Sequence, residues 1–357
     1  MALKLLFSDP RRLFYRIKRE FSAPSIGILR KLFRIYSLIF NDKTRIINDN
    51  NHRILYVYDT LLSPVTFDFL HYLYCTDQLR EKSGKEKIDL LLILRSNLIY
   101  SREKTYISAI GNDNINWRIN NIIIPIFKLF TASGRIYILD NKEAHEIIKR
   151  YRNIQPNGYE YATPVTAAQR LDSPDLFFSP AILVPDTARK IIDTYFPSSD
   201  NRRLVTITLR SYNYITARNS NIKAWVEFAS EIDPLKYRVV FIPDASADGV
   251  LTHKEANKFE TFDSACWNIE LRAALYQRAW MNMGVVCGPL TISALMDKPL
   301  TIMIDRIMDY PEEYQKHILS QGITPGKPPI FYSKSCRFYL GRDEKEIITK
   351  IFNEYSD

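Results

Sequence analysis

Apolar residues in this chain gather in short runs rich in β-branched and aromatic side chains, and these runs alternate with amphipathic stretches of helical spacing. In the first half, strands are predicted at 54–59, 88–94 and 135–139, with helices starting at Ser63 and covering 116–130 and 142–152. Strands that alternate with helices are typical of parallel sheets, because each parallel connection must cross the sheet. Pro125 is expected to kink its helix, since proline lacks the N–H donor.

The same order of elements returns in the second half. The stretch 204–244 predicts a strand (204–210), a polar loop (211–221), a helix (222–232) and a second strand (237–244). After it, the pattern predicts a helix at 267–282, a strand at 284–287, a helix at 290–296, a strand at 300–304 and a helix at 343–355.

A chain of 357 residues exceeds the usual size of one hydrophobic core, so two domains are expected. Turn-rich segments at 156–159 and 173–180 place the boundary between them. We predict an α/β fold with one Rossmann-like domain at 46–175 and another at 176–340. The closing helix lies within 341–357, and a path back to the N-terminal domain is one option for it.

Positive charge is concentrated at the N-terminus. The whole chain carries +9, and residues 1–40 hold nine Lys or Arg against Asp9 and Glu20, which is +7 of that total. Helices are predicted after Pro10 and Pro24, and the second has a basic side opposite a broad apolar side. Such helices lie in membrane interfaces, where each basic residue near an anionic leaflet adds about 1 kcal/mol. Residues 1–45 are therefore predicted to associate with an anionic membrane surface; packing on the protein body is the alternative.

Several other classes are disfavoured. No apolar run is long enough to span a bilayer, and no cleavable signal is evident. The four cysteines are far apart, without a CxxC pair, and neither HExxH nor GxSxG occurs. No GxGxxG follows a strand, and the segment 322–327 (GITPGK) is one residue short of a P-loop. The sequence thus predicts no cofactor and no metal site.

Candidate ligand-binding residues lie where predicted strands end. Arg210 ends the strand at 204–210, and the following loop adds Arg218. Ligands of open parallel sheets bind beyond the carboxyl ends of the strands, so these arginines suit an anion such as a nucleotide phosphate. Gly288 and Pro289 form a turn before a helix whose free N–H groups suit the same kind of ligand. The alternatives are a solvated strand-end charge for Arg210 and an ordinary tight turn at Gly288.

The stretch 272–304 (RAALYQRAWMNMGVVCGPLTISALMDKPLTIMI), preceded by a strand that ends in arginine, resembles the nucleotide-binding half of GT-B fold glycosyltransferases of the bacterial lipopolysaccharide and capsule type. The resemblance implies two facing Rossmann-like domains, with the donor in the C-terminal half. It places the donor phosphates and sugar on Arg210, Arg218, Asp244, Gly288, Pro289, Leu290, Thr291 and Asp305. The EX7E pair of one large retaining group is missing, so inversion or retention stays open.

An inverting transfer also needs a general base for the acceptor hydroxyl. In several GT-B enzymes the base follows the first strand of the N-terminal domain, where this chain has Asp59. Asp68 is the second candidate, with His71 one helical turn later on the same face. The alternatives are a loop cap for Asp59 and a surface pair for Asp68 and His71.

The sequence as a whole predicts a metal-independent glycosyltransferase that moves a hexosyl or related sugar from a nucleotide-sugar donor to a glycan or lipid-linked acceptor. It is expected in the cytoplasm, peripheral on the inner membrane. One alternative is a GT-B-fold sugar-nucleotide epimerase, and another is a non-enzymatic module that binds a membrane or nucleic acid. Nucleic acid is disfavoured as a partner, because the cations are confined to two helices with broad apolar faces.

Overall fold

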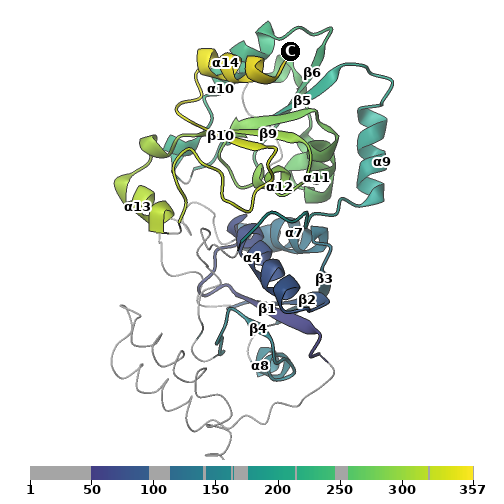
Figure 1. Ribbon diagram of the computed structural model, residues 1–357, viewed down its shortest axis with the longest axis vertical. Coiled ribbons are helices and arrows are strands. Elements are labelled where there is room, and N and C mark those ends of the chain that lie inside the picture. Colours follow the sequence, from purple (N-terminus) through teal and green to yellow (C-terminus); the bar gives the residue numbers. More distant parts are fainter. Residues whose placement is uncertain are drawn as a thin grey trace, which may run out of the picture.

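The computed structural model describes residues 50–95, 113–139, 142–161, 164, 176–213, 215–245, 256–320 and 322–356. They form two α/β domains, each built on a parallel sheet (Figure 1). The first sheet has the order β3-β2-β1-β4, with β1 at Arg53–Asp59, β2 at Lys87–Ile93, β3 at Ser133–Leu139 and β4 at Ile154–Gln155. The second has the order β10-β9-β8-β5-β6-β7, with β5 at Arg203–Thr208, β6 at Tyr237–Ile242, β7 at Glu260–Thr261, β8 at Met281–Val285, β9 at Leu300–Asp305 and β10 at Cys336–Leu340.

Helices cover both faces of each sheet, as crossover connections between parallel strands require. On the first sheet, α8 (Lys142–Lys149) packs on one face, and α4 (Asp68–Lys82) and α7 (Ile124–Leu129) pack on the other. On the second sheet, α10 (Ile222–Glu231) and α14 (Lys345–Ser356) pack on the outer face. The face toward the first domain carries α9 (Asp186–Tyr195), α11 (Ile269–Arg278) and α12 (Thr291–Ala294).

One apolar core is shared by both domains. Tyr56 and Leu73 from the first domain belong to the same buried cluster as Leu275 and Phe331 from the second, and all four side chains are fully buried. Helices α7 and α11 are in direct contact there. The domains therefore meet through hydrophobic packing.

The α/β class and the longer strands predicted from the sequence are confirmed, and the helix predicted at 222–232 is observed as α10. The Asn221 carboxamide caps α10 by accepting a hydrogen bond from the Ala224 N–H. The helix predicted at 267–282 is observed as α11, but its predicted end is wrong, because α11 ends at Arg278 and β8 begins at Met281. Strand β8 is buried along its whole length, so its sequence shows no alternation that would separate it from a buried helix.

The predicted kink at Pro125 takes the form of a π-helical turn. Residues Ile119–Ile123 (η1) form this turn between α6 (Asp113–Arg118) and α7, and Pro125 lies in the first turn of α7. Proline cannot donate the α-helical hydrogen bond, and its ring clashes with the preceding turn, so the wider turn accommodates it.

The change of domain falls near Pro185, later in the chain than expected. The Thr131 N–H donates to the Ala181 carbonyl over 3.0 Å, and the Leu183 N–H donates to the Leu129 carbonyl over 2.7 Å. Residues 176–184 are thus held on the first domain, whereas α9 packs against α11 of the second. In the closing helix, α14, the side chains of Ile348, Ile351 and Phe352 lie in the outer core of the second domain.

The predicted N-terminal amphipathic helices of residues 1–45 lie outside the described residues. Within the described ranges, no helix is both long and apolar enough to cross a membrane.

Candidate active site

The carboxyl edge of the second sheet brings together the predicted site residues of that domain. Thr208 at the end of β5 pairs with Ile242 of β6 and with Gly284 of β8, and Val285 pairs with Ile304 of β9. The segments that leave these strands therefore start at the same edge. They carry Arg210, Asp244, Gly288 and Asp305.

Arg210 is buried at this edge and is held by its own loop. Its backbone N–H donates to the Ser220 hydroxyl over 2.9 Å, and its guanidinium donates to the Asn219 side chain. Burial lowers the pKa of Arg210, and the positive charge of Arg218 lowers it further, so two cations lie close together. Two neighbouring positive charges repel each other, and a bound anion would reduce this repulsion.

Arg218 faces a pair of tyrosines from the segment after β9. Its Nη1 donates to the Tyr314 hydroxyl over 2.7 Å, and its guanidinium lies 5.4 Å from the ring centroid of Tyr310 and 5.3 Å from that of Tyr314. Its Nε is buried without a hydrogen-bond partner among the described residues. A buried donor without a partner carries a desolvation penalty that an anionic ligand would remove.

Asp244 and Asp305 have different surroundings. Burial raises the pKa of Asp244, whereas the nearby positive charges of Arg210 and Arg272 oppose that change. Both oxygens of Asp305 accept backbone N–H groups, from Ile307 over 3.1 Å and from Gly326 over 2.8 Å. Asp305 therefore holds the segment 322–327, which is one residue short of a P-loop motif, against the end of β9.

The turn at Gly288 packs against the first domain. A Cβ on Gly288 would lie only 2.5 Å from the Cβ of Phe67, the residue just before α4. Pro289, Leu290 and Thr291 are buried, and the Thr291 hydroxyl donates back to the Gly288 carbonyl over 2.5 Å. Their predicted role as a phosphate-facing turn stays a prediction, and the close contact that Gly288 makes here is with Phe67.

The start of α4 presents Asp68 and His71 to the second domain. Asp68 is exposed, accepts a hydrogen bond from Thr66 over 3.1 Å, and interacts electrostatically with Arg218. His71 Nε2 lies 2.6 Å from the Tyr332 hydroxyl, so this pair links the two domains. Burial lowers the pKa of His71, although the Asp68 charge acts in the opposite direction.

Asp59 lies at the end of β1, as expected, but it is buried in an ion pair. Its carboxylate accepts from Arg95 Nη2 over 2.7 Å and from the Tyr159 hydroxyl over 2.5 Å. Another contact comes from the Leu61 N–H over 3.0 Å. These partners occupy its oxygens, so the geometry favours Asp68 over Asp59 as the carboxylate that meets an acceptor.

Two further residues at this site were missed from the sequence. Arg118 of α6 donates to the Val65 carbonyl over 2.7 Å, and its guanidinium lies 5.8 Å from the ring centroid of Tyr212 in the second domain. The Tyr212 hydroxyl is buried without a hydrogen-bond partner. Arg118 lies in the interior of a predicted helix, where no local signal marks it, whereas Tyr212 lies in the loop that already carried Arg218.

No protein-family model matches the chain, and no curated protein matches its sequence. Among solved structures, it is similar to a glycosyl transferase family 9 protein from Veillonella parvula (12% identity, 84% of this chain and 89% of that chain covered, TM-score 0.48). It is also similar to ADP-heptose lps heptosyltransferase II of E. coli (10% identity, 85% and 98% covered, TM-score 0.48). A third is the wall teichoic acid polymerase TagF (8% identity, 96% and 88% covered, TM-score 0.38).

These structures are of the GT-B glycosyltransferase type, which is the class that the sequence resembles. The activities and substrates of those proteins are not carried over to this one, because the identities are 12% or less and the TM-scores lie below 0.5. Among the residues that the structure describes, no group of three or more His, Cys, Asp or Glu side chains is arranged to hold a metal ion.

Proposed function

We propose that the protein is a glycosyltransferase that moves a sugar from a nucleotide-sugar donor to a glycan or lipid-linked acceptor in bacterial surface glycan synthesis. The observation that carries this proposal is the placement of Arg218, with an unpartnered buried Nε, beside Arg210 at the carboxyl edge of the second sheet. Asp68 of the first domain interacts with the same arginine. Cations from one domain and a carboxylate from the other are the groups that an inverting glycosyl transfer would use.

Arg210 and Arg218 would bind the donor diphosphate. When the bond between the sugar and the phosphate oxygen breaks, negative charge grows on the leaving nucleotide. Fixed guanidinium groups stabilise that charge and can bind phosphate oxygens in a bidentate manner. Asp244, which is near Arg210, would accept hydrogen bonds from hydroxyl groups of the ribose or the sugar.

Asp68 would act on the acceptor. As the acceptor oxygen forms its bond to the sugar carbon, its proton passes to the Asp68 carboxylate, which is exposed and has only Thr66 as a hydrogen-bond partner among the described residues. The basic residues 1–45 would hold the enzyme at the cytoplasmic face of the inner membrane, where lipid-linked acceptors are present; their charge of +7 over the first 40 residues supports this part of the proposal.

The proposal is tested by calorimetric titration with UDP-, GDP-, ADP- and CMP-linked sugars. Arg218→Ala should weaken binding of the best nucleotide by about 1.5–3 kcal/mol, which is roughly tenfold to 150-fold in Kd. Arg218→Lys should recover part of that loss, because an ammonium group lacks the planar fork. The matched control is Arg202→Ala, which removes an arginine paired with Asp200 just before β5 begins, at the opposite edge of the sheet.

Asp68→Asn belongs in the same series. It should keep the wild-type nucleotide Kd and lose transfer, because Asp68 faces the acceptor. A wild-type protein that binds none of these nucleotides would refute the proposal and favour a non-enzymatic role. Equal affinity of the wild type and Arg218→Ala would remove the arginine pair from the donor site.

A further inference from the structure

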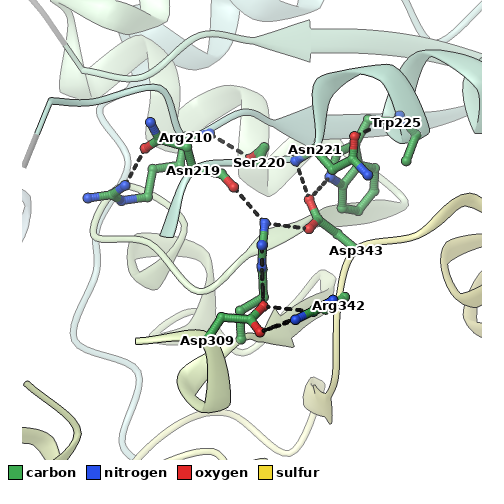
Figure 2. Close-up of polar contacts among 10 residues, drawn as sticks. Arg210, Asn219, Ser220, Asn221, Trp225, Asp309, Arg342 and Asp343 are labelled. Carbon is green, nitrogen blue, oxygen red and sulfur yellow. Dashed lines mark hydrogen bonds and ion pairs between the residues drawn. The ribbon is translucent and has the colours of Figure 1, made fainter. Parts of the chain in front are cut away.

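The loop that carries Arg210 and Arg218 is fastened by a residue far away in the sequence. Asp343 follows β10 and is buried. One of its oxygens, Oδ2, accepts from the Asn221 N–H over 2.7 Å and from Trp225 Nε1 over 2.8 Å, so it binds the end of the loop and the first turns of α10 (Figure 2). A buried carboxylate is stable only when such donors compensate for its lost hydration.

The other oxygen of Asp343 binds Arg306, the residue after β9. Arg306 Nη1 donates to Asp343 Oδ1 over 2.8 Å and to the Asn219 carbonyl over 2.7 Å. The same guanidinium pairs with Asp309 at 3.3 Å, and Asp309 in turn pairs with the exposed Arg342 at 3.0 Å. Arg306 therefore joins the buried carboxylate to the backbone of the loop.

Asn219 completes the connection to Arg210. Its Oδ1 accepts from the Arg210 guanidinium and, over 3.1 Å, from the Tyr212 N–H. Its Nδ2 donates to the Tyr212 carbonyl over 3.0 Å. A continuous series of hydrogen bonds thus runs from Asp343 through Arg306 and Asn219 to Arg210, and Arg218 precedes Asn219 in the chain.

The loop is also held in a strained shape. Ile215 has a φ of 52°, in the left-handed region that β-branched residues rarely adopt. Its carbonyl accepts hydrogen bonds from Arg210 Nη1 over 3.3 Å and from the Arg218 N–H over 3.0 Å. Strain of this kind persists only where the surroundings fix the backbone, and it is typical of functional loops.

We propose that Arg306 and Asp343 are positioning residues that hold the 210–221 loop in the conformation that directs Arg210 and Arg218 at an anionic donor. This inference rests on the proposed function. Neither residue touches the ligand; each acts through the loop. Fully satisfied buried polar networks select one conformation of a loop, and this one connects three segments that are distant in sequence.

The test compares Arg306→Ala and Asp343→Asn with the wild type, using the nucleotide that the wild type binds best. At a temperature where each variant is fully folded, the Kd should rise about tenfold, comparable to losing one hydrogen bond to a charged group. Arg306→Lys should recover part of the affinity. Arg342→Ala is the control, because Arg342 is exposed and, among the described residues, its side chain binds Asp309 alone. The Kd of this variant should equal that of the wild type.

A double-mutant cycle separates positioning from a general loss of stability. In the Arg218→Ala background, Arg306→Ala should weaken binding by less than it does in the wild type, because one of the two arginines that it positions has already been removed. The backbone amides of residues 218–220 donate hydrogen bonds within the loop. Without ligand, these amides should exchange their hydrogens faster in Arg306→Ala than in the wild type. If Asp343→Asn does not fold, the comparison of Arg306→Ala and Arg306→Lys with the wild type still tests the proposal.

Unchanged affinity in Arg306→Ala, beside a wild type that binds nucleotide, would overturn this inference and leave the proposed function intact. Fully additive effects in the cycle would overturn it as well. A wild type that binds no nucleotide would overturn the proposed function, and the positioning role with it.

Discussion

Gly288→Ala tests how the two domains fit together. An alanine Cβ at this position would lie 2.5 Å from the Phe67 Cβ, 2.8 Å from its Cγ and 2.9 Å from its Cδ2. Carbon atoms pack at about 3.5–4.0 Å, so each contact is too short by about 1 Å. The Phe67 Cβ is fixed to its backbone, so relief requires a shift of the turn before α4 relative to the second domain.

The cost follows from this geometry. Forcing an extra methyl group into a packed core costs about 1–3 kcal/mol. Gly288 does not have a positive φ, so alanine adds no backbone strain and reduces the entropy of the unfolded chain, which offsets about 0.4–1 kcal/mol. We expect a net loss of up to about 2.6 kcal/mol in the free energy of unfolding, toward the upper end of this range because the contacted Cβ is fixed to the backbone.

Urea unfolding and nucleotide titration of the same variant provide the two readouts. Gly84→Ala is a suitable control, because its Cβ would contact nothing within 4 Å and its cost comes only from a φ of +60°. That cost is about 1–2 kcal/mol, at a place remote from the domain contact. Phe67→Ala should not rescue Gly288→Ala, since the shortest contact is with the Cβ that alanine keeps.

Two outcomes would contradict this reasoning. If Gly288→Ala is as stable as the wild type, the contact with Phe67 is not tight. If it keeps its stability and loses only nucleotide affinity, the glycine is required for close approach of the ligand, as the sequence had suggested.

Two other predictions concern the first domain. Asp59→Asn should lower the free energy of unfolding by about 3–5 kcal/mol, which is the range for a buried charge left without its partner. The control is Asp186→Asn, which breaks an exposed ion pair and should change the free energy of unfolding by less than about 1 kcal/mol. Normal stability of Asp59→Asn with abolished transfer would instead identify Asp59 as the base. Because burial lowers the pKa of His71 below its ordinary 6.5, the unfolded chain takes up this proton first as the pH falls. The stability advantage of the wild type over His71→Gln should therefore shrink between about pH 7.5 and about pH 5.5 in urea unfolding; a constant difference would show that the histidine does not titrate in this range.

The strand ends were the part of the site that local sequence signals could reveal. Arg210 and Asp244 follow apolar runs whose limits are visible in the sequence, and parallel strands end at one edge. Arg306 also follows an apolar run directly, since it comes after β9, but this arginine binds the loop. No local pattern in the sequence marks Asp343, because all of its side-chain partners described above lie far away in the chain: Asn221 and Trp225 are more than a hundred residues earlier, and Arg306 is 37 residues earlier.

Tertiary packing decided the remaining differences. The end of the helix predicted at 267–282 became β8, because a strand buried on both faces lacks the alternation that identifies strands. The Gly288 turn has the composition of an anion site, yet Phe67 fills the space beside Gly288. Phe67 is distant in the sequence, so no local pattern predicts this contact. Asp59 was placed correctly at a strand end, and Arg95 and Tyr159 then engage it.

The shared middle core bears on how freely the two halves can move or be exchanged. A hinge at Pro185 that separated α4 and α7 from α11 would expose the cluster around Leu73, Leu275 and Phe331 to water, at about 25 cal/mol for each Å² of apolar surface. Opening for substrate entry would then have to come from loops. The halves are also not modular, since each presents an apolar face shaped by the other. A chimera that joins either half to a foreign partner would need the matching face as well, and cutting the chain at Pro185 would yield two fragments that depend on each other for solubility.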